Sequence, residues 1–274
     1  MKYASDFRRM ALDALQGNWR VAILTGFVAS LMGASLWSAG GSGSSSGSDS
    51  GSVGDLFYNL DSATLQLIQT ILVIAVVVLI VWGIVAFIIG GAAKFGYAIF
   101  NLNLVDRKEA RFSDLFSQFD RLGSGIIMNL LVGVFTFLWT LLFVIPGIIK
   151  SFSYSMTPFV LAEHPELSEN EAITRSRELM DGNKWRLFCL MFSFIGWELL
   201  ICTPLLVSVV LLVSKFAIGI GTVGAGTWIF LGISFLFFFV GQLFLCPYQN
   251  AALAAFYRDI SAENAPVLPG EIIE

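Results

Sequence analysis

Residues 168–186 read SENEAITRSRELMDGNKWR, and residues 5–20 read SDFRRMALDALQGNWR. Both stretches place apolar side chains at helical spacing and end in a glycine that Asn, Trp and Arg soon follow. In the later stretch Ser168 and Glu171 form the S-x-x-E pattern of a capping box, and Gly182 is suited to end the helix. In the earlier stretch Ser5 and Gly17 hold the corresponding places. Each stretch therefore predicts an amphipathic helix that precedes a long apolar run.

A third, looser copy occupies residues 112–123, FSDLFSQFDRLG, where Gly123 is expected to end the helix. A similar patch lies toward the end of the apolar runs that follow the copies: Gly96-Tyr97, Ser153-Tyr154 and Pro247-Tyr248. The pattern predicts three repeats of an interfacial helix and a transmembrane hairpin, over about residues 1–97, 98–163 and 164–260. The alternative is that interface residues recur through composition alone.

The composition points to a membrane protein. Of 274 residues, 56% are hydrophobic and 13% are charged, whereas soluble domains carry about 25% charged residues. The net charge of −4 gives no basic surface for nucleic acid. These values exclude a soluble two-domain enzyme, a disordered chain and a free nucleic-acid binder. We expect a single integral membrane domain over residues 1–274.

The apolar runs predict six membrane spans, because a spanning helix needs about 20 apolar residues. Pro146-Gly147 interrupts the third run and predicts a tight hairpin there. The alternative is one span that ends near Lys150 and a re-entrant segment after it. The expected spans are 21–38, 65–91, 126–145, 147–162, the run between Arg186 and Lys215, and the run between Lys215 and Arg258.

Charge asymmetry favours the six-span count. With six spans, 14 of the 16 Lys and Arg residues lie on the side that holds both termini, and the positive-inside rule makes that side cytoplasmic. With five spans, the four cations of residues 163–186 would move outside. The sequence therefore predicts an all-α, six-helix transmembrane bundle with both termini cytoplasmic (N-in/C-in), multi-pass in a bacterial cytoplasmic membrane.

The connecting segments follow from this topology. Residues 40–54, GGSGSSSGSDSGSVG, are expected to form a flexible extracytoplasmic Gly/Ser loop. Residues 261–274 are expected to form a cytoplasmic tail. Residues 21–39 are also compatible with a cleaved secretory signal, which is the alternative for the first span.

Glu198 is the sharpest polar feature in the apolar runs. It lies 12 residues past Arg186, which is about 18 Å along a helix and near the membrane midplane. An ionised carboxylate there is costly, so we expect a raised pKa or a partner, for which Lys150 is the candidate. Glu198 is either a proton or cation site or a protonated or paired packing residue. The candidate intramembrane polar site comprises Glu198, Lys150, Ser153, Tyr154 and Thr157.

Aromatic and basic residues next to the amphipathic stretches indicate contact with lipid headgroups. Trp and Tyr concentrate at membrane interfaces, and each nearby cation attracts anionic lipid by about 1 kcal/mol. The expected partners are the lipid bilayer and its anionic headgroups, with a protein partner also conceivable and no nucleic acid. The expected interface anchors are Trp19, Arg20, Trp185 and Arg186.

The nucleophilic and metal-ligating residue types are sparse. His164 is the only histidine, and the three cysteines lie inside apolar runs, so neither zinc spacing nor a Ser-His-Asp arrangement is found. We expect no catalytic residue, no metal and no cofactor, and hence no enzyme.

Several stretches resemble a known family: residues 146–156, 171–186 and 193–197, and Pro247-Tyr248 with Phe256-Tyr257. They resemble an uncharacterised family of bacterial polytopic membrane proteins, the domain of unknown function 975 (DUF975). A more distant similarity is to the membrane domain that precedes some glycerophosphodiester phosphodiesterases. The resemblance implies a topology and residence in the cytoplasmic membrane, and it brings no established activity or catalytic residue.

Three functions are compatible with these features. The first is a non-enzymatic membrane accessory, lipid-organising or envelope-assembly component. The second is a small-molecule or ion transporter or channel that uses the polar site around Glu198. The third is a lipid-modifying enzyme, for which the sequence offers no convincing cluster of acids or nucleophile.

Overall fold

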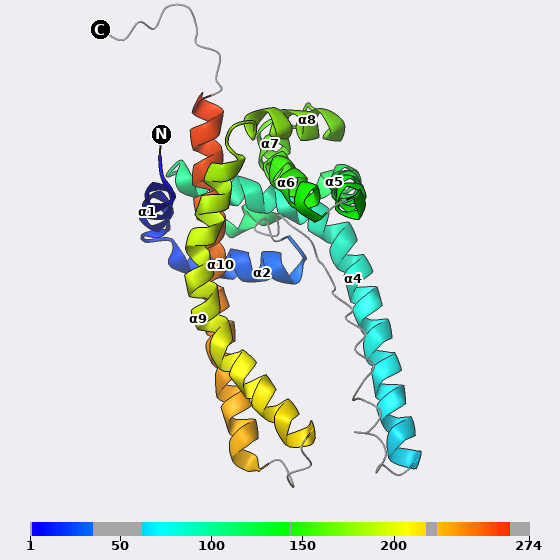
Figure 1. Cartoon of the computed structure of the whole chain (residues 1–274). Helices are drawn as coiled ribbons and strands as arrows, with labels where there is room; N and C mark the ends of the chain where they lie inside the picture. Colours follow the sequence, from blue (N-terminus) through cyan, green and yellow to red (C-terminus); the bar gives the residue numbers. More distant parts are fainter. Residues whose placement is uncertain (1, 35–61, 143, 218–223, 264–274) are drawn as a thin grey trace, which may run out of the picture. The chain divides into compact units, whose positions relative to one another are not determined.

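The computed structural model describes residues 2–34, 62–142, 144–217 and 224–263. These residues form α-helices and short 3-10 helices and contain no strand (Figure 1), which confirms the all-α class. The Gly/Ser loop at 40–54 lies outside the described residues, as does the tail beyond Glu263. The helices are α1 Ala4–Leu15, α2 Trp19–Leu31, α4 Ser62–Val105, α5 Leu122–Leu142, α6 Val144–Tyr154, α7 Thr157–Glu163, α8 Glu169–Leu179, α9 Lys184–Ala217 and α10 Ala225–Glu263, with 3-10 turns η1 Phe112–Phe116 and η2 Phe119–Arg121.

Within the ranges that the structure describes, four segments are long and apolar enough to cross a membrane. They are Gln69–Val105 in α4, Phe112–Leu141 with α5, Lys184–Lys215 in α9 and Ala225–Glu263 in α10. The helix in the first expected span, α2, has 13 residues. In the fourth expected span α6 ends at Tyr154 and α7 begins at Thr157. The six-span count, the orientation and the three repeats therefore stay predictions.

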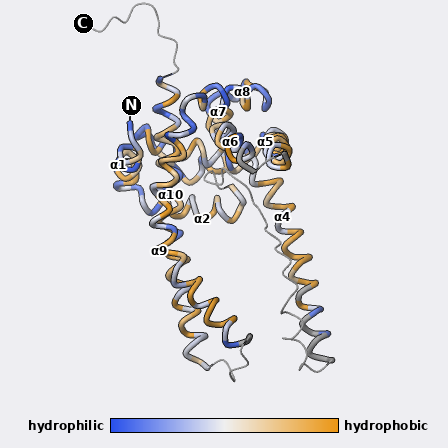
Figure 2. Tube along the Cα trace, viewed as in Figure 1, coloured by the Kyte–Doolittle hydropathy of each residue, from blue (hydrophilic) through white to orange (hydrophobic). Residues whose placement is uncertain are grey.

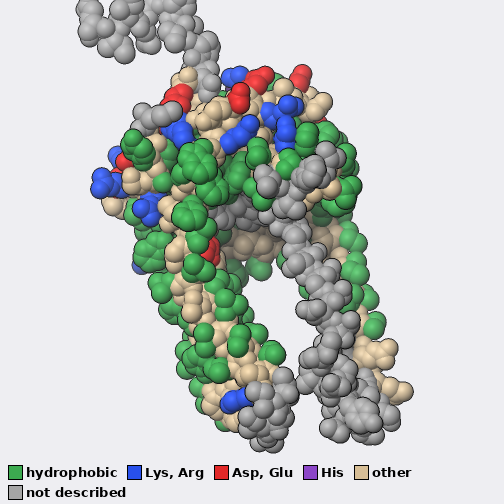
Figure 3. Space-filling view, viewed as in Figure 1, with side chains coloured by type: hydrophobic (Ala, Val, Ile, Leu, Met, Phe, Trp, Pro, Cys, Tyr) green, Lys and Arg blue, Asp and Glu red, His purple; other side chains and the backbone are tan. Residues whose placement is uncertain are grey.

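The chain divides into two compact units. Unit 1 comprises residues 1–41, 86–194 and 245–274, and unit 2 comprises residues 42–85 and 195–244. Unit 1 therefore contains all three stretches that the sequence analysis compared, together with the three Tyr patches. Its charged side chains are prominent in Figure 3, whereas the helices of unit 2 are mostly apolar along their length (Figure 2).

The first and third amphipathic stretches fold as helices. Helix α1 buries Phe7, Ala11, Ala14 and Leu15. Helix α8 begins at the predicted capping box, where Glu171 N–H donates to Ser168 Oγ at 3.4 Å and Ser168 N–H donates to Glu171 Oε2 at 2.9 Å. Positive φ angles follow both helices, +85° at Gly17 and +76° at Gly182, a conformation that glycine adopts without a steric cost.

The middle stretch differs from its prediction. Residues 112–121 form the turns η1 and η2, and Gly123 lies inside α5 instead of ending a helix. Ser117 takes part in the turn, because its hydroxyl and its N–H both donate to the Asp114 carbonyl oxygen, at 2.7 and 3.2 Å. Such local side-chain bonds to the backbone compete with a continuous helix.

The end of α5 and the start of α6 also lie earlier in the chain than the sequence predicted. Helix α5 ends at Leu142 and α6 begins at Val144, so Pro146 and Gly147 lie in the first turn of α6 and not in the connection. Proline is tolerated there because the first-turn N–H groups have no intrahelical acceptor. Gly147 allows a close approach, since a Cβ at this position would lie 2.8 Å from Thr140 Cα.

Glycine pairs bring the helices of unit 1 into backbone contact. A Cβ on Gly91 of α4 would lie 2.8 Å from Gly125 Cα of α5, and one on Gly125 would lie 2.5 Å from Ala92 N. A Cβ on Gly90 would lie 2.7 Å from the carbonyl oxygen of Met32, just after α2. Small residues at helix contacts are typical of membrane proteins because they let backbones approach closely.

In unit 2, residues 195–217 of α9 and 225–244 of α10 pack against each other. Lys215 Nζ donates to Thr227 Oγ1 at 2.7 Å near the connection between them. Gly241 faces Ile201, where an added Cβ would lie 2.8 Å from the Ile201 Cγ2 atom. Many outward side chains of this pair are large and apolar, among them Val210 at 65% exposure. A helix that is apolar all round is typical of a membrane span.

Candidate functional site

An ion-pair cluster joins three helix ends in unit 1, and we call it the Arg258 cluster. Arg258 of α10 donates from Nε and Nη2 to the two carboxylate oxygens of Asp106, at 2.9 and 2.7 Å. Its Nη1 pairs with Glu163 at the end of α7. Tyr257 donates its hydroxyl to the other oxygen of Glu163 at 2.7 Å. The Arg258 and Asp106 side chains are 28% and 21% exposed, so the cluster is only partly open to solvent.

Arg186 forms a second cluster at the start of α9. Its guanidinium donates to Asp259 Oδ2 at 2.5 Å and to Glu263 Oε2 at 3.0 Å. The Arg186 side chain is 12% exposed and lies 5.9 Å from the ring centre of Phe7 and 5.8 Å from that of Phe256. Arg186 therefore contacts α1 and α10 within unit 1 instead of extending outward as an exposed anchor.

The other expected anchors differ in exposure. Trp185 is 69% exposed and stacks on Phe188 with ring centres 5.0 Å apart. Arg20 is exposed and Trp19 is intermediate. Trp185 and Arg20 are thus available to the surroundings of the protein, as an interface anchor requires.

The residues of the candidate intramembrane polar site fall into two groups. In unit 2, Gln242 Nε2 donates to Glu198 Oε2 at 2.8 Å, which links α9 and α10. In unit 1, Lys150 Nζ lies 4.8 Å from the ring centre of Trp139. The expected pairing of Glu198 with Lys150 stays a prediction, and the structure supplies Gln242 as a partner that the sequence analysis did not anticipate.

The hydroxyl-bearing members of that site are buried around the α6–α7 break. Ser153, Tyr154 and Thr157 are 2%, 5% and 0% exposed. Ser176 of α8 donates its hydroxyl to the Ser153 carbonyl oxygen at 2.8 Å, so the break is joined to α8. Interhelical bonds of this kind stabilise helix packing in membranes.

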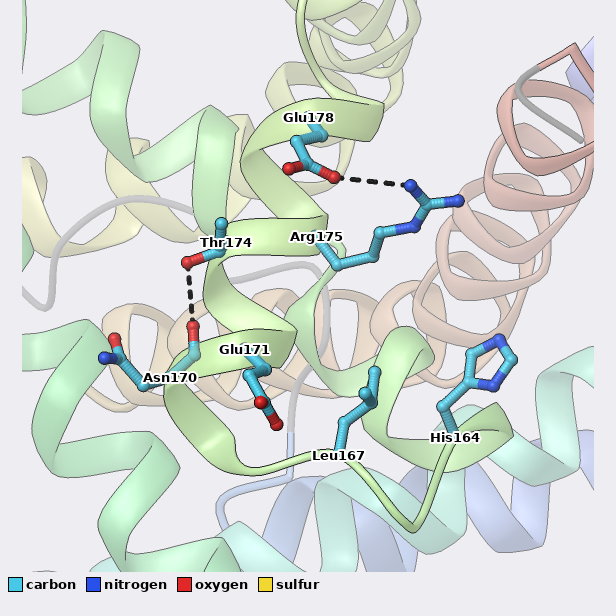
Figure 4. A pocket seen from close by; sticks show the side chains of 7 residues that line it. All are labelled: His164, Leu167, Asn170, Glu171, Thr174, Arg175 and Glu178. Atoms are coloured by element: carbon cyan, nitrogen blue, oxygen red, sulfur yellow. Dashed lines mark hydrogen bonds and ion pairs between the residues drawn. The ribbon is translucent and has the colours of Figure 1, made fainter. Parts of the chain in front are cut away.

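An open hollow of about 510 Å³ lies beside α8. Its polar groups are largely engaged with one another: Arg175 Nη1 lies 3.3 Å from Glu178 Oε2, and Thr174 donates to the Asn170 carbonyl oxygen at 3.0 Å (Figure 4). The lining residues are His164, Leu167, Asn170, Glu171, Thr174, Arg175 and Glu178.

Local hydrogen bonds set the acidity of two carboxylates near this hollow. Bonds from the Ser168 backbone N–H and hydroxyl lower the pKa of Glu171. The pKa of Glu166 is lowered by its own backbone N–H and by His164, whose Nδ1 lies 3.0 Å from Glu166 Oε1. These hydrogen bonds stabilise both carboxylates in the charged form, which is the form that accepts hydrogen bonds.

Metal ligation finds no support in the part of the chain that the structure describes. Within those ranges no group of three or more His, Cys, Asp or Glu side chains is placed to hold a metal ion. The three cysteines form no disulfide within the described ranges and are of intermediate exposure.

The Arg258 cluster is the main arrangement that sequence reasoning missed. Arg258 lies 152 residues from Asp106 and 95 from Glu163, so no local motif connects them. A signal was nevertheless present. Asp106, Glu163 and Tyr257 each lie nine residues after the tyrosine of a patch, at Tyr97, Tyr154 and Tyr248 respectively.

Comparison with known proteins finds a family match over part of the chain. Residues 141–264 match the model of a family described as a protein of unknown function (DUF975), and the chain is similar to that family over this range. No curated protein matches the chain. No solved structure matches it either.

Proposed function

We propose that this chain is a multi-pass protein of a bacterial cytoplasmic membrane and acts there as a non-enzymatic component that organises lipids or supports envelope assembly. The Arg258 cluster carries this proposal. Its arginine, two carboxylates and tyrosine bind one another, an arrangement that ties helix ends together. The four described segments that are long and apolar enough to cross a membrane support its residence there.

The proposal includes three repeats in a cyclic arrangement, which equivalent contacts in unit 1 support. Gly96 lies against η1, where an added Cβ would be 2.7 Å from the Asp114 carbonyl oxygen. Ser153, the equivalent of Gly96, accepts from Ser176 of α8. In the third copy the contact lies nine residues past the equivalent Pro247, where Phe256 packs on Phe7 of α1 with ring centres 5.3 Å apart. The interfacial element of each repeat thus packs on the end of the preceding one, and α1 closes the ring on the last.

The proposed orientation has both termini and the loop around His164 in the cytoplasm. Accessibility to an impermeant thiol reagent tests it, with the three native cysteines replaced by alanine and a single cysteine at His164. His164 is 54% exposed, so a labelled site would react readily once reached. We expect labelling only after cells are permeabilised, and rapid labelling of intact cells would contradict the orientation.

The organising role is tested in proteoliposomes with fluorescent phosphatidylglycerol. We expect the full chain to slow lateral diffusion of this anionic lipid more than that of phosphatidylcholine, because cations near the membrane surface attract anionic lipid. Equal diffusion of the two lipids, with and without protein, would contradict a lipid-organising role.

A transporter or channel is the second candidate, because Glu198 and Gln242 form a polar contact between two apolar helices. The same proteoliposomes, loaded with a pH-sensitive dye and tested for proton and cation flux, distinguish the two roles. If the chain only organises lipids, proteoliposomes with the native chain and with Glu198→Gln should both show the same flux as empty liposomes. A flux that Glu198→Gln abolishes would establish the transporter instead.

A further inference from the structure

Helix α4 ends on an arginine at a position where glycine is the usual residue. Lys108 N–H donates to the Asn103 carbonyl oxygen at 2.9 Å. Arg107 N–H donates to the Leu104 carbonyl oxygen at 3.3 Å. These two bonds form a Schellman motif, in which the residue after the cap takes a positive φ angle. Arg107 has a φ of +56° and is the one residue other than glycine with a positive φ in the described ranges.

The end of α2 offers a direct comparison. Ala34 N–H donates to the Ala29 carbonyl oxygen at 2.8 Å, and Gly33 N–H donates to that of Ser30 at 3.1 Å. This is the same motif, and Gly33 takes the positive φ, at +73°. Glycine adopts this conformation freely, whereas an arginine pays a steric cost. Strained backbone of this kind concentrates at binding sites, so the Arg107 side chain is a candidate for contact with a ligand.

The Arg107 guanidinium is available to an anion from outside the chain. Arg107 is exposed, and within the described residues it forms no ion pair with a carboxylate. The neighbouring cations are engaged, since Lys108 contacts Asp106 at 3.2 Å and Arg111 pairs with Glu109. Arg107 therefore differs from both of them in lacking a carboxylate partner.

The two flanking apolar segments indicate that Arg107 lies at a membrane surface. The segment Gln69–Val105 ends two residues before Arg107, and the segment Phe112–Leu141 begins five residues after it. Both are long and apolar enough to cross a membrane. In a bilayer the short connection between two such segments lies near the lipid headgroups, whichever side of the membrane it faces. In the proposed orientation that side is the cytoplasmic one.

Three phenylalanines form an aromatic patch shortly after this arginine. Phe112 and Phe119 lie against Phe116, at 5.5 and 5.4 Å between ring centres, and Phe116 is 43% exposed. The patch is held beside the last turn of α4, because Asn103 Nδ2 donates to Asp114 Oδ2 at 3.1 Å. Exposed aromatic rings near a basic side chain are typical of protein surfaces that contact the membrane interface.

We propose that Arg107 binds the phosphate of an anionic phospholipid, while the aromatic patch of Phe112, Phe116 and Phe119 packs among the upper acyl chains. This Arg107 lipid site deepens the proposed lipid-organising role and rests on it. A guanidinium donates two parallel hydrogen bonds to a phosphate, and an anionic headgroup has no cation of its own that competes for that phosphate. A phospholipid is favoured over free phosphate because a soluble ion leaves the exposed ring surface in water.

The test uses the full chain with Phe116→Trp in neutral detergent, titrated with brominated phosphatidylglycerol and read as quenching of tryptophan fluorescence. Subtracting the titration of the native chain isolates the signal of the new tryptophan. We expect saturable quenching by phosphatidylglycerol and about fivefold weaker binding of brominated phosphatidylcholine. A new tryptophan that brominated lipid does not quench would overturn the proposal.

Two substitutions of Arg107 in that background separate lipid binding from stability. Arg107→Gln and Arg107→Gly should each weaken phosphatidylglycerol binding about fivefold, because each removes one cation at the membrane surface. Arg107→Gly should also raise the equilibrium constant for folding about threefold, since glycine relieves the positive φ. Denaturant unfolding without lipid measures that gain. Weaker lipid binding by a more stable protein excludes misfolding as its cause, and unchanged affinity in both variants would show that the site is wrong.

Arg111→Gln is the matched control, since Arg111 lies four residues further on, is 70% exposed and pairs with Glu109. It should leave the affinity within about twofold, and a loss equal to that of Arg107→Gln would reduce the effect to net charge and overturn the site. Excess inorganic phosphate should not displace the brominated lipid, and full displacement would show a soluble-anion site instead. If the Arg107 lipid site fails while the native chain still slows phosphatidylglycerol diffusion, the organising role stands, so the two failures are distinguishable.

Discussion

Both carboxylate oxygens of Asp106 accept hydrogen bonds from Arg258, Oδ1 from Nε at 2.9 Å and Oδ2 from Nη2 at 2.7 Å. A bidentate guanidinium–carboxylate pair fixes orientation as well as distance. Because Glu163 pairs with the same guanidinium, one arginine holds the ends of α4 and α7 against α10. The cluster therefore connects the ends of these three helices to one another.

Replacing Arg258 with Met is expected to destabilise unit 1 by about 2 kcal/mol, because it leaves Asp106 and Glu163 without their shared cation. Removal of one partner from a fully buried pair costs about 3–5 kcal/mol, and the partial exposure of these side chains reduces that cost. Thermal unfolding in detergent, followed by circular dichroism, measures the change. Lys108→Gln is the matched control, since Lys108 also contacts Asp106 but is 66% exposed. An equal effect of the two variants would contradict the role of Arg258.

Gly91→Ala is expected to cost more than about 2 kcal/mol, because the new Cβ would overlap the Gly125 backbone and overpacking forces backbone shifts. Gly133→Ala on α5 is the control, since no atom lies within 4 Å of its added Cβ. That variant should be neutral or gain up to about 1 kcal/mol from helix propensity. Denaturant unfolding in detergent compares the two, and a stable Gly91→Ala protein would place α4 and α5 farther apart than described.

Gly182→Ala is expected to destabilise the chain by about 1 kcal/mol, because Gly182 has a φ of +76° that alanine adopts only with strain. Gly123→Ala should not destabilise it, since Gly123 lies inside α5 and has no positive φ. The difference between the two midpoints of unfolding is the measurement. Similar destabilisation by both variants would indicate that a helix ends at Gly123, as the sequence predicted.

The start of α8 should lose protection in acid. The pKa of Glu171 is lowered in the folded chain by the Ser168 bonds, so its stabilising contribution is complete above the unfolded value of 4.5. That contribution is lost as the pH falls through the lower folded pKa. Hydrogen exchange of the first α8 amides, corrected for the intrinsic rate, should show this loss below about pH 4.5.

Two variants check the origin of that pH dependence. Ser168→Ala should open the start of α8 by about 1 kcal/mol at neutral pH and reduce the acid-dependent change. Glu169→Gln, which alters a neighbouring carboxylate outside the Ser168 bonds, should keep it. An acid response that Ser168→Ala does not reduce would show that the Ser168 hydroxyl contributes nothing to it, because the bond from the Ser168 N–H to Glu171 remains in that variant.

Local features of the fold were predictable from the sequence, and long-range ones were not. The capping box at Ser168 and the helix end at Gly182 are decided by neighbouring residues, and the structure confirms both. Gly123 and Pro146 are turn-forming residue types as well, but Gly123 lies inside α5 and Pro146 lies in the first turn of α6. Local composition alone could not distinguish these outcomes.

The candidate site illustrates the same limit. Glu198 was conspicuous as a carboxylate in an apolar run, yet its partner Gln242 lies 44 residues away on the next helix. Arg186 looked like an interface anchor beside Trp185, whereas three acceptors within unit 1 engage it. The choice between an outward and an inward arginine depends on Asp259 and Glu263, whose position relative to α9 only the fold determines.

The most direct test of the lipid-organising account is native mass spectrometry of the chain released from nanodiscs made of its own host membrane. The account predicts that the protein retains anionic phospholipid in preference to zwitterionic lipid, at a defined stoichiometry. A chain that emerges without lipid, or with a bound soluble metabolite in place of anionic lipid, would contradict it.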